Sequence, residues 1–233
     1  MEDKPRSNSL FIQQSKFNNQ QSQFSVCPCL RGRFVGMTRR EMTTSRLEAF
    51  SDGVIAIIVT IMVLELRAPS QPKWPALLKV APIFLSYGLS FLVVSIMWVN
   101  HHHLIHAVRE VTARLLWSNL NLLFWMSLVP FVTDFLGKNY RQPMAVALYG
   151  LDLALCGCSF YLLRTELVRQ EASDGNLRDY HVGVQRKNAF SAALYFSSVP
   201  LAYLSIYASF FIFALIPAMY FLPEKKLAGS GHE

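Results

Sequence analysis

Apolar residues along this chain gather into long runs that charged residues interrupt only at the ends. Residues 80–100, 115–133 and 188–222 contain no Asp, Glu, Lys or Arg, and residues 144–163 contain only Asp152. A helix needs about 20 apolar residues to cross the hydrocarbon core of a bilayer. Three of the runs have about that length, and the run of 35 residues at 188–222 is long enough for two short spans.

One more run, residues 46–66, carries polar side chains in its first two turns and is otherwise almost purely aliphatic. As a helix it extends about 31 Å, which matches the thickness of a bilayer core. With this run the pattern predicts an all-α membrane protein of six transmembrane helices. Their expected positions are residues 46–66, 76–98, 114–133, 144–163, 188–201 and 202–222, with Pro200 as either a kink or the last turn.

The chain ends differ in composition from these six spans. Residues 1–42 are rich in Gln, Asn and Ser and hold a basic cluster, so we predict a mostly disordered arm there. The transmembrane domain is expected at 43–223, with a short tail at 224–233. Residues 164–187 form the longest charged segment between spans, and we expect a soluble loop there.

Basic residues lie unequally on the two sides of such a six-helix arrangement. Both termini fall on one side, which holds 17 Lys and Arg residues, whereas the other side holds 5. Because cytoplasmic loops carry the excess of positive charge, we predict a multi-pass protein of the cell membrane with both termini in the cytoplasm. This topology accounts for the net charge of +7 and argues against a nucleic-acid partner.

Polar residues recur where three of the expected helices reach the cytoplasmic side. Because the first and third helices begin there and the second ends there, their polar groups lie at one depth and are able to meet. We therefore predict a hydrogen-bonded network that fixes the orientation of the first helix. Its expected members are Arg46, Phe50, Ser51, Asp52, His101, Trp117 and Asn119, and Arg46 and Asp52 are each expected to reach across to another helix.

The histidines near the end of the second helix suggest hydrogen bonding rather than metal binding. Consecutive residues of a helix point about 100° apart, so His101, His102 and His103 cannot share one ion. His102 and His106 lie on one face and could hold zinc, but we predict no metal site. Nor does the sequence suggest a cofactor, catalytic residues or an enzyme, since it lacks a Ser-x-Lys pair, a nucleophile elbow and a full set of metal ligands.

Several motifs in order resemble those of one known family. The segment Arg46-x-x-x-Phe50-Ser51-Asp52-Gly53 resembles the signature of the endolysosomal potassium leak channel family. The segments that begin at Trp98 (WVNHH), Arg114 (RLLWSN) and Leu128 (LVPFVT) are similar to the six-helix prokaryotic members. The resemblance implies a homotetramer in which the first helix of each subunit lines a central pore. It also implies a constriction formed by Ile57, Thr60, Ile61 and Leu64.

Spacing supports that pore face independently, because Ile57, Ile61 and Leu64 recur at i, i+4 and i+7 on one side of a helix. An ion loses its hydration in a narrow aliphatic ring, so such a ring acts as a gate. The carbonyl filter Thr-Val-Gly-Tyr-Gly is absent from the sequence, and we therefore predict only modest selectivity for potassium. The alternatives are a proton-coupled secondary transporter and a non-selective cation or proton channel.

Overall fold

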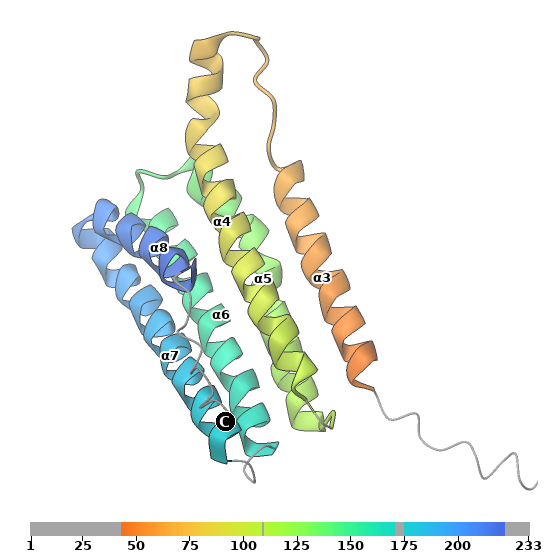
Figure 1. Cartoon of the computed structure of the whole chain (residues 1–233). Coiled ribbons are helices and arrows are strands. Elements are labelled where there is room, and N and C mark those ends of the chain that lie inside the picture. Colours follow the sequence, from red (N-terminus) through yellow and green to blue (C-terminus); the bar gives the residue numbers. More distant parts are fainter. Residues whose placement is uncertain (1–42, 109, 171–174, 222–233) are drawn as a thin grey trace, which may run out of the picture. The chain divides into compact units, whose positions relative to one another are not determined.

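The computed structural model describes residues 43–108, 110–170 and 175–221, which lie in a single compact unit (Figure 1). The expected arm at 1–42 and tail at 224–233 lie outside these residues. The described part contains six helices, which agrees with the predicted all-α class. They are α3 (Thr44–Leu64), α4 (Trp74–His106), α5 (Ala113–Lys138), α6 (Pro143–Gln170), α7 (Gly175–Leu204) and α8 (Ile206–Phe221).

Helix boundaries differ from the expected ones mainly after the fourth span. The charged segment 164–187, expected as a loop, is helical in both of its described parts, 164–170 and 175–187. An ion pair one turn apart, Arg169 Nη1 to Glu166 Oε1 at 2.6 Å, supports the extension of α6. The helix α6 continues past the apolar run because Arg, Glu, Leu and Gln, which make up most of its last turns, are good helix formers.

The break between the last two helices falls at Ser205, three residues later than expected. Pro200 lies inside α7 and is therefore not the turn. The Ser205 amide donates to the Leu201 carbonyl at 2.7 Å, so the chain completes one more turn before α8 begins. Three other prolines, at 82, 130 and 217, also lie within helices.

Four of the described helices are long and apolar enough to cross a membrane: α3, α4, α5 and α6. The fifth, α7, begins with polar residues, and α8 is a shorter apolar helix. Consecutive helices run in opposite directions (Figure 1). The N-terminal ends of α3 and α5 therefore lie beside the C-terminal end of α4, which is the arrangement that the predicted network of polar residues requires.

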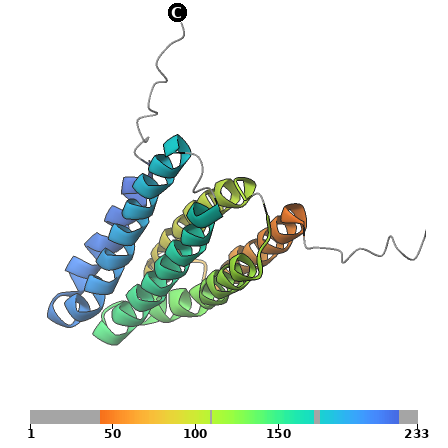
Figure 2. The ribbon, with the colours of Figure 1, turned by 90° about the horizontal axis from the view of Figure 1, so that it is seen from below.

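Two apolar clusters hold the six helices together, and α4, α5 and α6 contribute to both of them. Seen from below, α3 lies at one edge of the unit and the pair α7 and α8 at the other (Figure 2). One apolar cluster joins α3 to α4, α5 and α6 through residues such as Ile58, Leu122 and Leu163. A second cluster joins α4, α5 and α6 to α7 and α8 through Tyr149 and Phe213, among others. Helix α3 is thus held on one side only.

Gly137 of α5 meets α4 where there is no room for a side chain. A Cβ atom at this position would lie 2.9 Å from the Cα atom of Ile83. Since backbone cannot rotate away, we expect Gly137→Ala to force the two helices apart and to lower the stability by about 1–3 kcal/mol. Melting followed by size-exclusion chromatography measures the loss.

Gly88→Ala in α4 is the matched control, because no atom outside the adjoining backbone of α4 itself lies within 4 Å of the added Cβ. Alanine favours a helix over glycine by about 1 kcal/mol, so this variant should melt at the same temperature as the parent protein or higher. Equal losses in both variants would contradict a tight contact between α4 and α5 at Gly137.

Candidate functional site

Helix α3 has one face buried in the subunit and one face uncovered. The buried residues are spaced by three or four positions: Leu47, Ser51, Ile55, Ile58 and Met62. Opposite them lies an uncovered stripe of mainly apolar side chains, here called the α3 stripe. It comprises Phe50, Ile57, Thr60, Ile61 and Leu64. Ile57 is 58% exposed and Leu64 is 77% exposed within the subunit. All four residues expected at a pore constriction therefore lie on the uncovered side.

Thr60 contributes the only hydroxyl of the α3 stripe. Its Oγ1 donates to the Ile57 carbonyl at 2.8 Å, which uses its hydrogen within the helix. The lone pairs of the oxygen remain on the uncovered face, because a hydroxyl accepts as well as donates. The stripe thus presents an oxygen acceptor between two aliphatic side chains, Ile57 and Leu64.

Three buried polar side chains connect α3, α5 and α4 in a chain of hydrogen bonds. Asn119 Nδ2 donates to Ser51 Oγ at 2.9 Å, and Ser51 Oγ donates to the Leu47 carbonyl at 2.9 Å. His101 Nε2 lies 2.7 Å from Asn119 Oδ1. An amide oxygen only accepts, so His101 carries its proton on Nε2. The structure thus brings together Ser51, His101 and Asn119, which are fully buried.

Asp52 takes part in a separate contact at the edge of this group. Trp98 Nε1 of α4 donates to Asp52 Oδ1 at 2.9 Å. Asp52 therefore reaches across to another helix as expected, although its partner is Trp98 and not His101, Trp117 or Asn119. Sequence reasoning did not assign Trp98 a role. The signal was available, since an indole N–H near a membrane surface requires an acceptor and Asp52 lies in the third turn of the neighbouring helix.

Three of the expected network residues do not join it within the subunit. Trp117 is 71% exposed and Phe50 is 54% exposed. Arg46 is exposed, and among the described residues of the same chain no hydrogen bond or ion pair of its side chain links it to another helix. These three side chains lie on the outside of the subunit.

Glu48 is a further polar residue that the sequence reasoning passed over. Its Oε1 atom lies 3.1 Å from His102 Nδ1 and 3.0 Å from His106 Nε2, both on α4. Glu48 and Asp52 are one turn apart, so the two carboxylates of α3 face the side of α4 that carries Trp98, His102 and His106. This contact joins the same two helices as the hydrogen bond of Trp98.

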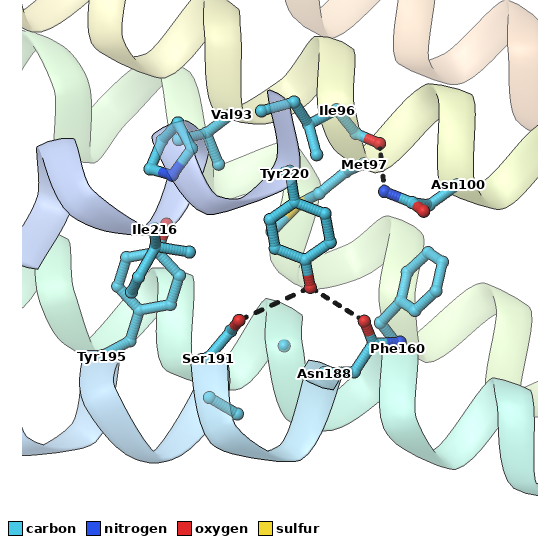
Figure 3. A pocket seen from close by; sticks show the side chains of 13 residues that line it. Val93, Ile96, Met97, Asn100, Phe160, Asn188, Ser191, Tyr195, Ile216 and Tyr220 are labelled. Carbon is cyan, nitrogen blue, oxygen red and sulfur yellow. Dashed lines mark hydrogen bonds between the residues drawn. The ribbon is translucent and has the colours of Figure 1, made fainter. Parts of the chain in front are cut away.

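A cavity of about 50 Å³ lies away from α3, between α4, α6, α7 and α8. In Figure 3, Tyr220 of α8 points its hydroxyl toward α7, where it donates to Asn188 Oδ1 at 2.8 Å. The rest of the lining is mainly apolar, and it includes no Asp, Glu, Lys or Arg. This cavity is small and uncharged, and it shares no residue with the α3 stripe.

Comparison with known proteins decides the family. Residues 46–130 match the family model described as "Endosomal/lysosomal potassium channel TMEM175". A potassium channel of Chryseobacterium sp. (strain P1-3) is 37% identical over 189 residues, which cover 81% of this chain and 98% of that protein. The chain belongs to the TMEM175 family. The resemblance seen in the sequence motifs is therefore confirmed.

Other TMEM175 relatives extend the comparison. A potassium channel of Streptomyces collinus is 36% identical over 54% of this chain and 65% of its own length. The human endosomal/lysosomal proton channel TMEM175 is 34% identical over 44% of this chain and 23% of its own length. The crystal structure of a lysosomal potassium-selective channel TMEM175 homolog from Chamaesiphon minutus superposes with a TM-score of 0.67, at 28% identity, over 76% of this chain and 95% of that one.

Family and fold together assign this TMEM175 chain a coarse function. It is a multi-pass membrane protein with the helical fold of TMEM175 channels, and it is a cation channel. The uncovered α3 stripe and the buried Ser51, Asn119 and His101 group are the two features of the structure that bear on how it conducts ions.

Proposed function

We propose that this protein is a potassium-permeable cation channel in which four copies of α3 surround a central pore. The observation that carries the proposal is the α3 stripe: Ile57, Thr60, Ile61 and Leu64 are uncovered in the subunit, while the opposite face of the helix is packed. A helix that lines a pore between subunits needs one face packed within its own subunit and the opposite face uncovered. The names of the bacterial relatives, which are potassium channels, support the choice of ion.

In this arrangement Ile57, Ile61 and Leu64 form aliphatic rings around the path. A narrow ring of this kind excludes water, so it closes the pore, because an unhydrated ion in an apolar medium costs many kcal/mol. When the rings widen, partly hydrated ions pass. The Thr60 oxygens then supply a ring of acceptors between the apolar ones, and modest selectivity for potassium over sodium follows from size and hydration.

Tetramer formation is supported by a second uncovered face, on α5. Trp117, Phe124 and Phe131 recur every seven residues on one side of this helix and are 71%, 56% and 62% exposed. A row of large exposed aromatic side chains provides a surface for a neighbouring subunit, since aromatic residues dominate the energetics of such contacts. We propose that α5 packs against the next copy in the ring.

The unequal distribution of basic residues supports a cell-membrane location with both termini in the cytoplasm. The buried group of Ser51, Asn119 and His101 then lies near the cytoplasmic end of α3, on the side of the helix away from the path. We propose that this group holds the orientation of α3 and thereby keeps Ile57 and Leu64 turned toward the axis.

Proton conduction is the second candidate function, because the vertebrate relatives are named proton channels.

A secondary transporter has less support. Carriers place a polar substrate site at mid-membrane, and the cavity between α4, α6, α7 and α8 is small and lined without charged residues. Asp152 of α6 is buried, and its Oδ2 atom makes no hydrogen bond with any described residue.

Reconstitution in planar bilayers tests the proposal. We expect unitary currents that reverse closer to the potassium than to the sodium equilibrium potential under bi-ionic conditions. A reversal potential that follows a pH gradient would instead assign the current to protons. Equal permeation by sodium and potassium would leave a general cation channel, and saturable flux at low turnover without unitary currents would indicate a carrier.

Cysteine labelling tests the pore face itself. In a background with the native cysteines replaced, we expect a charged thiol reagent to block the current of Leu64→Cys and Thr60→Cys, because both positions face water in the path. The matched control is Met62→Cys, on the packed face of α3, which should keep its current. An unmodified Leu64→Cys channel would place this residue against lipid and contradict the pore assignment. Mass photometry of the purified protein should give the mass of four chains.

A further inference from the structure

Three side chains that can bind a metal converge where the first turns of α3 face the end of α4. Glu48 comes from α3, and His102 and His106 come from one face of α4. Their ligand atoms, one from each residue, all lie within 4.8 Å of one another. The two imidazole rings lie edge to face with centroids 4.4 Å apart, which places both beside the same carboxylate.

Distances in this group are those of ligands around an ion. Glu48 Oε1 lies 3.1 Å from His102 Nδ1 and 3.0 Å from His106 Nε2. Ligands of a tetrahedral zinc ion with bonds of about 2.0–2.1 Å lie about 3.3 Å apart. The two carboxylate–imidazole distances thus differ from this value by only a few tenths of an ångström, and the two imidazole nitrogens lie within 4.8 Å of each other.

A hydrogen-bonded ion pair explains this arrangement less well. His102 Nδ1 is buried and makes no hydrogen bond with any described residue, although it lies near Glu48 Oε1. Buried polar atoms are normally satisfied, so a nitrogen that lies 3.1 Å from a carboxylate without a well-directed hydrogen bond is available to bind an ion. A cation placed between the two groups supplies that partner for both.

We propose that Glu48, His102 and His106 form a binding site for a divalent transition-metal ion of the zinc type. Two imidazole nitrogens and one carboxylate oxygen suit zinc or cobalt, whereas calcium and magnesium require mainly oxygen ligands. Water occupies the fourth position. The side chain of His106 is 59% exposed and that of His102 is 38% exposed, so an ion reaches the site from solution.

Neighbouring residues orient the site and favour a cation. Trp98 packs against His102 with ring centroids 5.9 Å apart and donates to Asp52 on α3. Asp52 lies one turn beyond Glu48, and its carboxylate adds negative charge near the ion. Because the ligands come from two helices, a bound ion ties the start of α3 to the end of α4.

Metal binding by the purified full-length protein tests this site without any need for ion conduction. The affinity tag is removed, and Cys27 and Cys29 are replaced by serine because thiolates also bind zinc. Titration calorimetry should give one zinc ion per chain, and cobalt should give the visible absorption of a tetrahedral site. We expect zinc to raise the melting temperature.

Single substitutions identify the ligands. Glu48→Gln and His106→Gln should each weaken zinc binding at least tenfold, which is the loss seen when only an outer-shell partner of a metal is removed. His106 is largely exposed, so its replacement does not threaten folding. The control is His103→Gln, because His103 is an exposed histidine next to His102 on the helix, and this variant should bind zinc as the parent protein does.

Two results would overturn the site. One is the absence of zinc and cobalt binding by the folded parent protein at millimolar metal. The other is binding that Glu48→Gln and His106→Gln leave unchanged, or that His103→Gln weakens as much as they do. Neither result bears on conduction, so the proposed channel function stands or fails separately.

Discussion

Replacing Ile57 by asparagine should raise the potassium flux of reconstituted channels by about tenfold or more. Four copies of this side chain are proposed to form an aliphatic ring that excludes water, and an amide in each copy hydrates the ring. Removing a barrier of about 1.4 kcal/mol is enough for a tenfold change in rate. A potassium flux assay in liposomes measures the effect, and unitary recordings separate a longer open time from a larger current.

Val63→Asn is the matched control, since Val63 is also partly exposed on α3 but lies outside the α3 stripe. This variant should conduct like the parent protein, and selectivity for potassium should fall only in Ile57→Asn. Unchanged flux and ion preference in Ile57→Asn would mean that Ile57 faces something other than the ion path. A rise of equal size in both variants would point to a general loosening of α3.

Replacing Asn119 by leucine should cost about 2–5 kcal/mol of stability, because this residue connects three helices. Its amide donates to Ser51 on α3 and accepts from His101 on α4. Leucine has a similar size but leaves the buried His101 N–H and one side of Ser51 without partners, at about 1–3 kcal/mol for each unsatisfied group. Thermal melting, with the fraction of tetramer measured after heating, reports the loss.

Asn121→Leu provides the comparison within the same helix. Asn121 makes one side-chain hydrogen bond, from its Nδ2 to Ser159 Oγ at 2.7 Å, at a less buried position. We expect a loss of about 1 kcal/mol from this variant. If Asn119→Leu proved no less stable than Asn121→Leu, the buried group would not be what holds α3 in place.

The sequence was sufficient for the number and class of the helices. An uncharged run of about 20 residues has few stable alternatives in a bilayer, because every backbone polar group must be satisfied within the segment. It was also sufficient to place Ser51, His101 and Asn119 at one depth, since that follows from the direction of each helix. It was not sufficient for α6 and α7, where charged residues continue the helices beyond the apolar runs.

Contacts between particular atoms were decided only by the fold. Depth along the membrane is set by counting residues, but the rotation of each helix about its axis depends on how its side chains pack against its neighbours. That rotation pairs Asp52 with Trp98 and leaves Trp117 and Arg46 on the outside of the subunit. It also brings Glu48 of α3 into contact with His102 and His106 of α4, and the spacing of residues along either helix does not predict this contact.

The sequence by itself determined that this chain crosses a membrane, and that α3 has an aliphatic face, because both follow from local composition and helical period. The tertiary structure decided which face of α3 is covered. Five side chains of that helix pack against α4 and α5, and the stripe with Ile57 and Leu64 is what remains. Burial is a property of the assembled helices, so no local pattern fixes it.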